Sequence, residues 1–252
     1  MFMELDPNQI IIIFFAIFIG GFVKGLIGFG FPLVSLPLLS FIFSPVISVL
    51  LLFIPVMVTN LRELKIKNWL AYKEHYPLYV GVLMGIILGS NLFHNMRFAV
   101  INILIGILVI LISFINLYEI KINKTLLISK KFSFSYGFIA GGLGGMTAVL
   151  GPTIVAYLSS LKLKKKIFAE LVSLIFFLAL IPFYTVFFLY ETVSFFDLLG
   201  SALALIPAIS AQSIGLYLRT KVPEELFKKS ILIILIFIGI LVMYKNIFFI
   251  DA

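Results

Sequence analysis

The chain has 252 residues, of which 62% are hydrophobic and 12% are charged, and it carries a formal net charge of +8. The core of a soluble protein could not enclose so much apolar surface, so the composition predicts an all-α, multi-pass membrane protein. The absence of cysteine excludes disulfides, thiolate metal sites and cysteine nucleophiles. The two histidines, His75 and His94, are too few and too far apart for a helical zinc motif.

Apolar segments follow one another along the whole chain, and most are long enough for one helix across a bilayer core of about 30 Å. They span residues 9–43, 45–61, 76–93, 97–118, 132–161, 167–190, 195–218 and 226–249. The first and the fifth are longer, and the first would form a helix about 50 Å long. Both contain glycines near the middle, so we expect each to fold back as a hairpin of two shorter helices. Whether the arms meet within the membrane or cross it completely stays open, since the chain returns to its starting side either way.

The basic residues are concentrated in the loops that an alternating path through these segments places on one side of the membrane. Sixteen of the 19 lysines and arginines lie there, four each within residues 62–73, 121–131, 162–166 and 219–229. Because cytoplasmic loops are enriched in lysine and arginine, this side is predicted to be cytoplasmic and both termini extracytoplasmic. The membrane therefore explains the net charge, and we expect no nucleic-acid partner.

A glycine-rich motif occurs once in each half of the chain. Residues 21–30 read Gly-Phe-Val-Lys-Gly-Leu-Ile-Gly-Phe-Gly, and residues 137–146 read Gly-Phe-Ile-Ala-Gly-Gly-Leu-Gly-Gly-Met. Each half consists of a hairpin and three further spans, so it crosses the membrane an odd number of times and the halves have opposite topology. We therefore predict two inverted repeats in one integrated membrane domain, residues 1–118 and 132–252, joined by a basic cytoplasmic linker, residues 119–131.

Lys24 differs from the other basic residues because it lies inside an apolar segment rather than at its edge. A charge at bilayer depth costs roughly 2.5–3.5 kcal/mol on insertion scales, so it needs a partner or an aqueous pocket. The middle of the apolar segments contains no carboxylate that could pair with it, which makes a bound anion a reasonable partner. Alternatively, the lysine side chain extends to the membrane interface, where its ammonium group is hydrated.

The motif glycines have two alternative roles, which can coexist. At the hairpin tips they could expose backbone amides, with the second arms beginning near Pro32 and Thr147 and their N-termini favouring an oxyanion. They could instead allow close helix packing, as small residues do in membrane proteins. Polar side chains at Asn60, Gln212 and Ser213 could line a cavity or hydrogen-bond between helices. The residues predicted to bind substrate are Lys24, Gly25, Gly28, Gly30, Gly141, Gly142, Gly144, Gly145, Thr147, Gln212, Ser213 and Asn60.

Residues 21–30, followed by Pro37-Leu38-Leu39, carry a resemblance to a known family, together with Gly-Gly-Leu-Gly-Gly at 141–145, Gly151-Pro152 and the basic run 164–166. These features resemble the TauE/SafE family of membrane anion transporters, also called sulfite exporters, over nearly the whole chain. The resemblance implies export or uptake of sulfite, sulfonates or related organic anions.

The sequence thus predicts a secondary transporter that moves a small anion by alternating access within the lipid bilayer. A passive anion channel is an alternative hypothesis. An intramembrane enzyme is disfavoured because mid-span Asp, Glu, His and Cys, which would supply a base, nucleophile or metal ligand, are missing. We expect no catalytic residue, metal or cofactor, and self-association into a homo-oligomer is left open.

Overall fold

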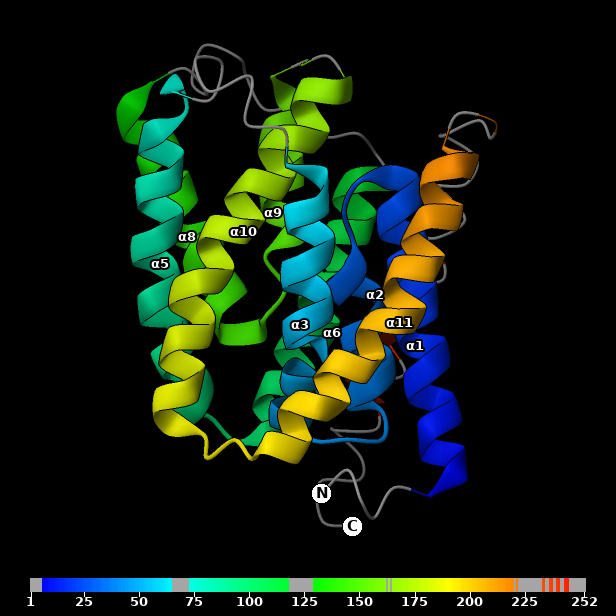
Figure 1. Cartoon of the computed structure of the whole chain (residues 1–252). Helices are drawn as coiled ribbons and strands as arrows, with labels where there is room; N and C mark the ends of the chain where they lie inside the picture. The colour runs from blue at the N-terminus through cyan, green and yellow to red at the C-terminus, as the bar shows by residue number, and fades with distance from the viewer. Residues whose placement is uncertain are drawn as a thin grey trace. The chain divides into compact units, whose positions relative to one another are not determined.

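The computed structural model describes residues 6–64, 73–117, 129–161 and 165–219, together with residues 163 and 221 and scattered positions between 233 and 244. Every regular element in this part of the chain is an α helix, which confirms the predicted all-α class (Figure 1). The helices are α1 (Pro7–Ile27), α2 (Phe31–Ser40), α3 (Pro45–Glu63), α5 (Tyr76–Asn95), α6 (Phe98–Leu117), α8 (Lys130–Thr147), α9 (Gly151–Ser160), α10 (Lys165–Tyr190) and α11 (Phe195–Leu218).

Helices α1, α3, α5, α10 and α11 contain apolar stretches long enough to cross a membrane. These five candidate spans confirm that the chain is a multi-pass membrane protein. Residues 119–128 of the predicted linker and most of the predicted span 226–249 lie outside the described residues.

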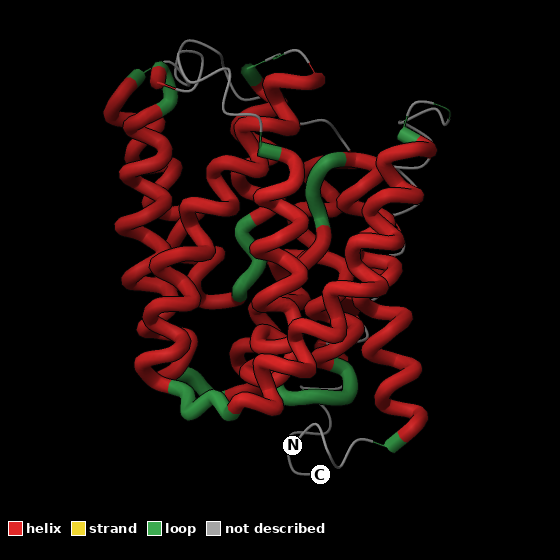
Figure 2. The backbone as a smooth tube through the Cα atoms, in the orientation of Figure 1, coloured by secondary structure: helices red, strands yellow, loops and turns green. Residues whose placement is uncertain are grey.

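The two long apolar segments are broken, as predicted, and each forms one long and one short helix (Figure 2). In the first, α1 has 21 residues and α2 has 10, and Gly28 and Gly30 at the break have φ angles of 92° and 97°. These left-handed conformations are readily accessible only to glycine. In the second, α8 has 18 residues and α9 has 10, and the break begins at Ala148, whose φ is 57°. A helix of ten residues is about 15 Å long, roughly half of a bilayer core.

The helices form two compact units, each of which contains one broken hairpin. Unit 1 comprises Met1–Thr59, Arg97–Leu117 and Thr192–Ala252, and unit 2 comprises Asn60–Met96 and Tyr118–Glu191. Unit 1 therefore combines the first hairpin with α11, and unit 2 combines the second hairpin with α5. Each unit thus draws on both predicted halves of the sequence.

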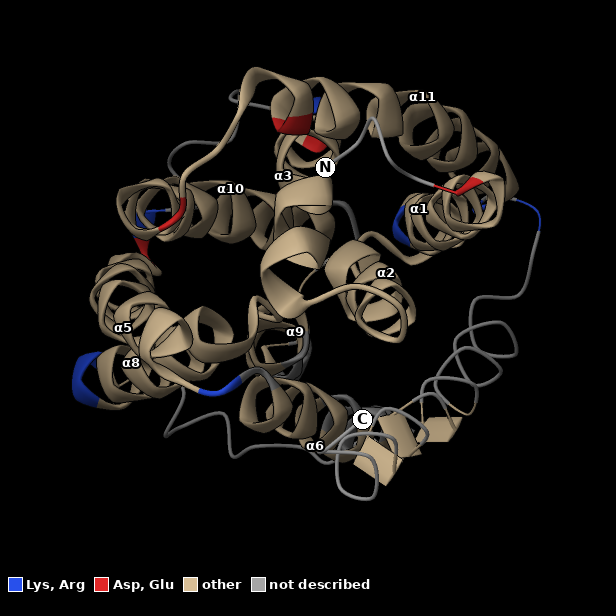
Figure 3. Cartoon of the chain, turned by 90° about the horizontal axis from the view of Figure 1, so that it is seen from below, with Lys and Arg blue, Asp and Glu red and all other residues tan. Residues whose placement is uncertain are grey.

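In unit 1, α1 packs against α11 in a parallel orientation through glycines that bring the two backbones together. A Cβ atom built on Gly21 would lie 2.6 Å from the carbonyl oxygen of Ala208, and one built on Gly25 would lie 2.3 Å from that of Gln212. The residue numbers increase together along both helices, so the helices run in the same direction. Figures 1 and 3 both show α1 and α11 side by side.

In unit 2, α8 packs against α5 in the same manner (Figure 3). A Cβ atom built on Gly137 would lie 2.4 Å from the carbonyl oxygen of Leu78, and one built on Gly141 would lie 2.3 Å from that of Val82. Helix α10 packs against α5 and α9, which completes the unit. Helices α5 and α8 are parallel, because the residue numbers increase together along both.

The contacts of the two parallel helix pairs occur at equivalent positions. Gly137 follows Gly21 by 116 positions, and Gly141 follows Gly25 by the same number. Their contact residues on α5 and α11 are likewise separated by one constant number, 130, in both contacts. This constant register relates α8 to α1 and α11 to α5.

Candidate functional site

Lys24 lies in the last turn of α1, immediately before the helix break, and only 1% of its surface is exposed. Its carbonyl oxygen accepts a hydrogen bond of 2.8 Å from the amide of Gly28, the residue that ends the helix. The sequence placed Lys24 inside an apolar segment, and the structure places it in the interior of unit 1, beside the first hairpin tip.

Arg219 contacts the same tip, although its position in the sequence groups it with the cytoplasmic loop charges. It follows the last residue of α11 and donates from Nε to the carbonyl oxygen of Leu26, at 3.0 Å, and from Nη2 to that of Lys24, at 3.2 Å. Carbonyl groups in the last turn of a helix have no intrahelical donor, so the guanidinium group caps α1. Ala208, Gln212, Gly215 and Arg219 recur at helical spacing on the face of α11 that meets α1, but the sequence does not show which helix that face meets.

Gln212 is fully buried on this face of α11, where its backbone contacts Gly25. Its side-chain Nε2 donates to the carbonyl oxygen of Thr59 at 3.1 Å, which links α11 to α3 within unit 1. Ser213 is only half-buried, and its hydroxyl donates to the carbonyl oxygen of Ile209 in its own helix. The structure therefore joins Gln212 to the residues around the first hairpin.

In the second hairpin, the residues predicted to form the tip lie within a helix instead. Gly141, Gly142, Gly144 and Gly145 all lie within α8, and the break follows them at residues 148–150. Thr147 is the last residue of α8 rather than the start of the second arm, which begins at Gly151. The physical reason is that a glycine face lets α8 continue in contact with the backbone of α5.

The remaining predicted residues are divided between the two units. Thr147 donates from Oγ1 to the carbonyl oxygen of Leu143 and accepts from the amide of Val149, so it shapes the end of α8. Asn60 lies in α3 with 1% of its surface exposed and belongs to unit 2, as do the four glycines of α8. Of the predicted glycines in unit 1, Gly25 lies within α1, whereas Gly28 and Gly30 form the break itself.

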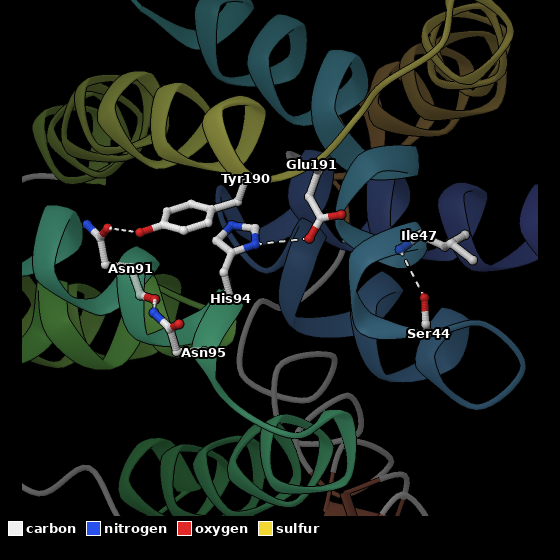
Figure 4. Close-up of polar contacts among 7 residues, drawn as sticks. All are labelled: Ser44, Ile47, Asn91, His94, Asn95, Tyr190 and Glu191. Atoms are coloured by element: carbon white, nitrogen blue, oxygen red, sulfur yellow. Dashed lines mark hydrogen bonds and ion pairs between the residues drawn. The ribbon is translucent and has the colours of Figure 1, made fainter.

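A polar cluster that the sequence does not reveal joins α5 to the end of α10 (Figure 4). Nδ1 of His94 lies 3.0 Å from a carboxylate oxygen of Glu191, and the His94 side chain is 3% exposed. The imidazole ring stacks on Tyr190, whose hydroxyl donates to Asn91 at 2.8 Å. Among the described residues, no three His, Asp or Glu side chains are placed to hold a metal ion.

A comparison with protein families gives a match over most of the chain. Residues 13–242 match the sequence model of the family described as sulfite exporter TauE/SafE. The matched region contains both helix breaks and the residues around the first tip. No curated protein and no solved structure shows a significant match to the chain.

Proposed function

Because this chain belongs to the sulfite exporter TauE/SafE family, we propose that it is a secondary transporter for a small anion such as sulfite or a sulfonate. The family membership supports a membrane transporter of the exporter type. The identity of the anion and the way it is bound are inferred from the residues around the first hairpin tip.

The buried position of Lys24 carries this proposal. Lys24, a cationic residue with 1% exposure, lies in the last turn of a membrane-spanning helix, and ionisable residues at such positions commonly belong to substrate or ion pathways. Arg219 brings a second positive charge to the same break through its bonds to the carbonyl groups of Lys24 and Leu26. Two cationic side chains at one interruption of a membrane helix favour an anionic substrate.

The backbone of the first hairpin supports the same ligand class. Helix α2 begins at Phe31, directly after Gly30, and Pro32 occupies its first turn. The first amides of a helix have no intrahelical partner, and the positive end of the helix dipole lies there. We propose that the substrate binds at this break, with Lys24 and the amides near Gly28 and Gly30 as its contacts, and that Gln212 lines the cavity.

The repeated register of the two helix pairs supports alternating access as the transport mechanism. Each unit combines a broken hairpin with a parallel helix from the other half of the sequence, at equivalent glycine positions. Inverted repeats provide two interchangeable conformations around a midplane site, which is the basis of alternating access in many carriers. We propose this mechanism over a passive channel for that reason.

We expect both termini to be extracytoplasmic. The charge pattern predicts that α1 and α11 start on one side of the membrane and that α5 and α8 start on the other, in agreement with the parallel packing within each pair. The chain has no native cysteine, so a single cysteine introduced at Asn8 can be labelled selectively. In intact cells, this residue should react with a membrane-impermeant maleimide. A cysteine that reacts only after the cells are opened would contradict the orientation.

Transport by the purified protein in liposomes tests the proposed function. We expect uptake of radiolabelled sulfite or a simple alkyl sulfonate that saturates with concentration and is accelerated by unlabelled anion inside the vesicles. Such counterflow requires a binding site that crosses the membrane in both directions with an anion bound, so it identifies a carrier. Protein-free liposomes provide the background. Flux that rises linearly without counterflow would favour a channel, and absence of flux for every sulfur oxyanion tested would contradict the proposal.

A further inference from the structure

We infer that Arg219 is a positioning residue for the anion site, because it holds the end of α1 in the geometry that places Lys24. This inference rests on the proposed function, and it adds a residue that lies almost 200 positions from Lys24 in the sequence. Its two hydrogen bonds, to Leu26 at 3.0 Å and to Lys24 at 3.2 Å, are the starting observation.

The end of α1 requires hydrogen-bond donors from outside the helix. The helix stops at Ile27, so carbonyl groups in its last turn point beyond the helix without intrahelical donors. Arg219 supplies Nε to the carbonyl group of Leu26, and with Gly28 it provides two donors to that of Lys24. The backbone of Lys24 is therefore held from its own hairpin and from α11 at the same time.

Equivalent positions of the two parallel helix pairs can be compared, because the register between them is constant. The residue of α5 equivalent to Arg219 is Gly89, 130 positions earlier, and the residue of α8 equivalent to Ile27 is Leu143, 116 positions later. Helix α8 continues for one further turn beyond Leu143, to Thr147. A Cβ atom built on Gly89 would lie 2.1 Å from the carbonyl oxygen of Gly142 in α8.

No side chain fits at position 89 without displacing α8, whereas the equivalent position on α11 carries an arginine. The arginine cap is therefore a specific feature of the first hairpin. By the same comparison, Ala140 of α8 is equivalent to Lys24 of α1, and Val82 of α5 is equivalent to Gln212 of α11. Unit 1 thus has cationic or amide side chains at three positions where unit 2 has small or apolar residues.

The chemistry of arginine suits this cap. A guanidinium group is always charged and presents N–H donors in a planar fork, which suits two neighbouring carbonyl groups. It also lies at the negative end of the α1 dipole, where a positive charge is stabilising. A lysine keeps the charge but offers a single ammonium centre, so it should restore the cap only in part.

Hydrogen exchange and transport kinetics of the full-length protein together test this inference. In Arg219→Ala, we expect amide exchange in the segment 22–34 to accelerate about tenfold or more, because charge-assisted hydrogen bonds to the helix end are lost. In proteoliposomes, the KM for sulfite should rise about tenfold with a smaller change in the maximal rate. Arg219→Lys should fall between Arg219→Ala and the unchanged protein in both measurements.

Lys221→Ala is the matched control, since it removes a basic residue from the same end of α11. The Lys221 side chain contacts Tyr217 of α11 itself, so this variant should leave exchange in segment 22–34 and the KM unchanged. Exchange in segment 145–151 of the second hairpin should stay constant in all variants.

The outcomes separate the inference from the proposed function. Unchanged exchange and unchanged KM in Arg219→Ala would overturn the positioning role, as would an equal effect of Lys221→Ala. Accelerated exchange with an unchanged KM would also overturn it, because the cap would then serve folding alone. If the unchanged protein moves no sulfur oxyanion, the proposed function fails, whatever the exchange data show for the helix end. If Arg219→Ala does not fold, exchange in segment 22–34 and the KM are compared between Arg219→Lys and the unchanged protein instead.

Discussion

Replacement of Lys24 by alanine is expected to lower sulfite transport, measured as Vmax/KM in proteoliposomes, by about 30-fold or more. Truncating one partner of a buried charge pair costs roughly 2–5 kcal/mol, and about 1.4 kcal/mol corresponds to a factor of ten in affinity. Lys24 is 1% exposed at the end of α1, so water cannot readily replace its ammonium group as a partner for the anion. The effect should therefore exceed that of any other single polar substitution in unit 1.

The fold should tolerate this change, because alanine occupies the corresponding position of α8, residue 140. Lys24→Met provides a second variant that keeps the aliphatic stem and removes only the charge. We expect both variants to fold, and the thermal midpoint in detergent, compared with that of the unchanged protein, checks this. Normal transport by either folded variant would show that Lys24 does not bind the anion.

The second large effect is expected at the interface of α5 and α8. Gly141→Val should lower the thermal midpoint by about 5–10 °C, because overpacking costs about 1–3 kcal/mol and each kcal/mol corresponds to roughly 2–4 °C in a protein of this size. A Cβ atom on Gly141 would lie 2.3 Å from the carbonyl oxygen of Val82, and this neighbour is backbone that cannot rotate away.

The adjacent glycine provides the control for this substitution. A Cβ atom on Gly142 would meet its nearest neighbour, the carbonyl oxygen of Gly85, at 3.9 Å, which is ordinary van der Waals contact. Gly142→Ala should therefore leave the thermal midpoint nearly unchanged, or raise it slightly through helix propensity. Equal destabilisation by the two substitutions would mean that close packing against α5 is not the reason for glycine at position 141.

The broken hairpins could be predicted from the sequence because two local signals agree there. The first apolar segment is too long for one span, and Gly28 and Gly30 supply the left-handed conformations that a sharp break requires. In the second hairpin the signals disagree, since the glycines serve packing along α8 and the left-handed residue is Ala148. Composition alone could not separate these two uses of glycine, so the predicted second tip lies several residues before the observed one.

Arg219 and the cluster around His94 could not be predicted for a different reason. Both depend on contacts between segments that are distant in the sequence: Arg219 with Leu26, and His94 with Glu191. A basic residue after a membrane helix has the same local pattern whether it faces water or caps another helix. Only the register between α1 and α11, which is a tertiary property, distinguishes these cases.

The exchange of helices between the two halves has a consequence for biosynthesis. Helix α1 leaves the ribosome well before α11, which packs against its glycine face. The first hairpin must therefore enter the bilayer before its native neighbour on this face has been made. Long-range pairing of this kind slows assembly. Unit 1 is thus completed only after α11 has been made, and a product that lacks α11 leaves α1 without its native neighbour.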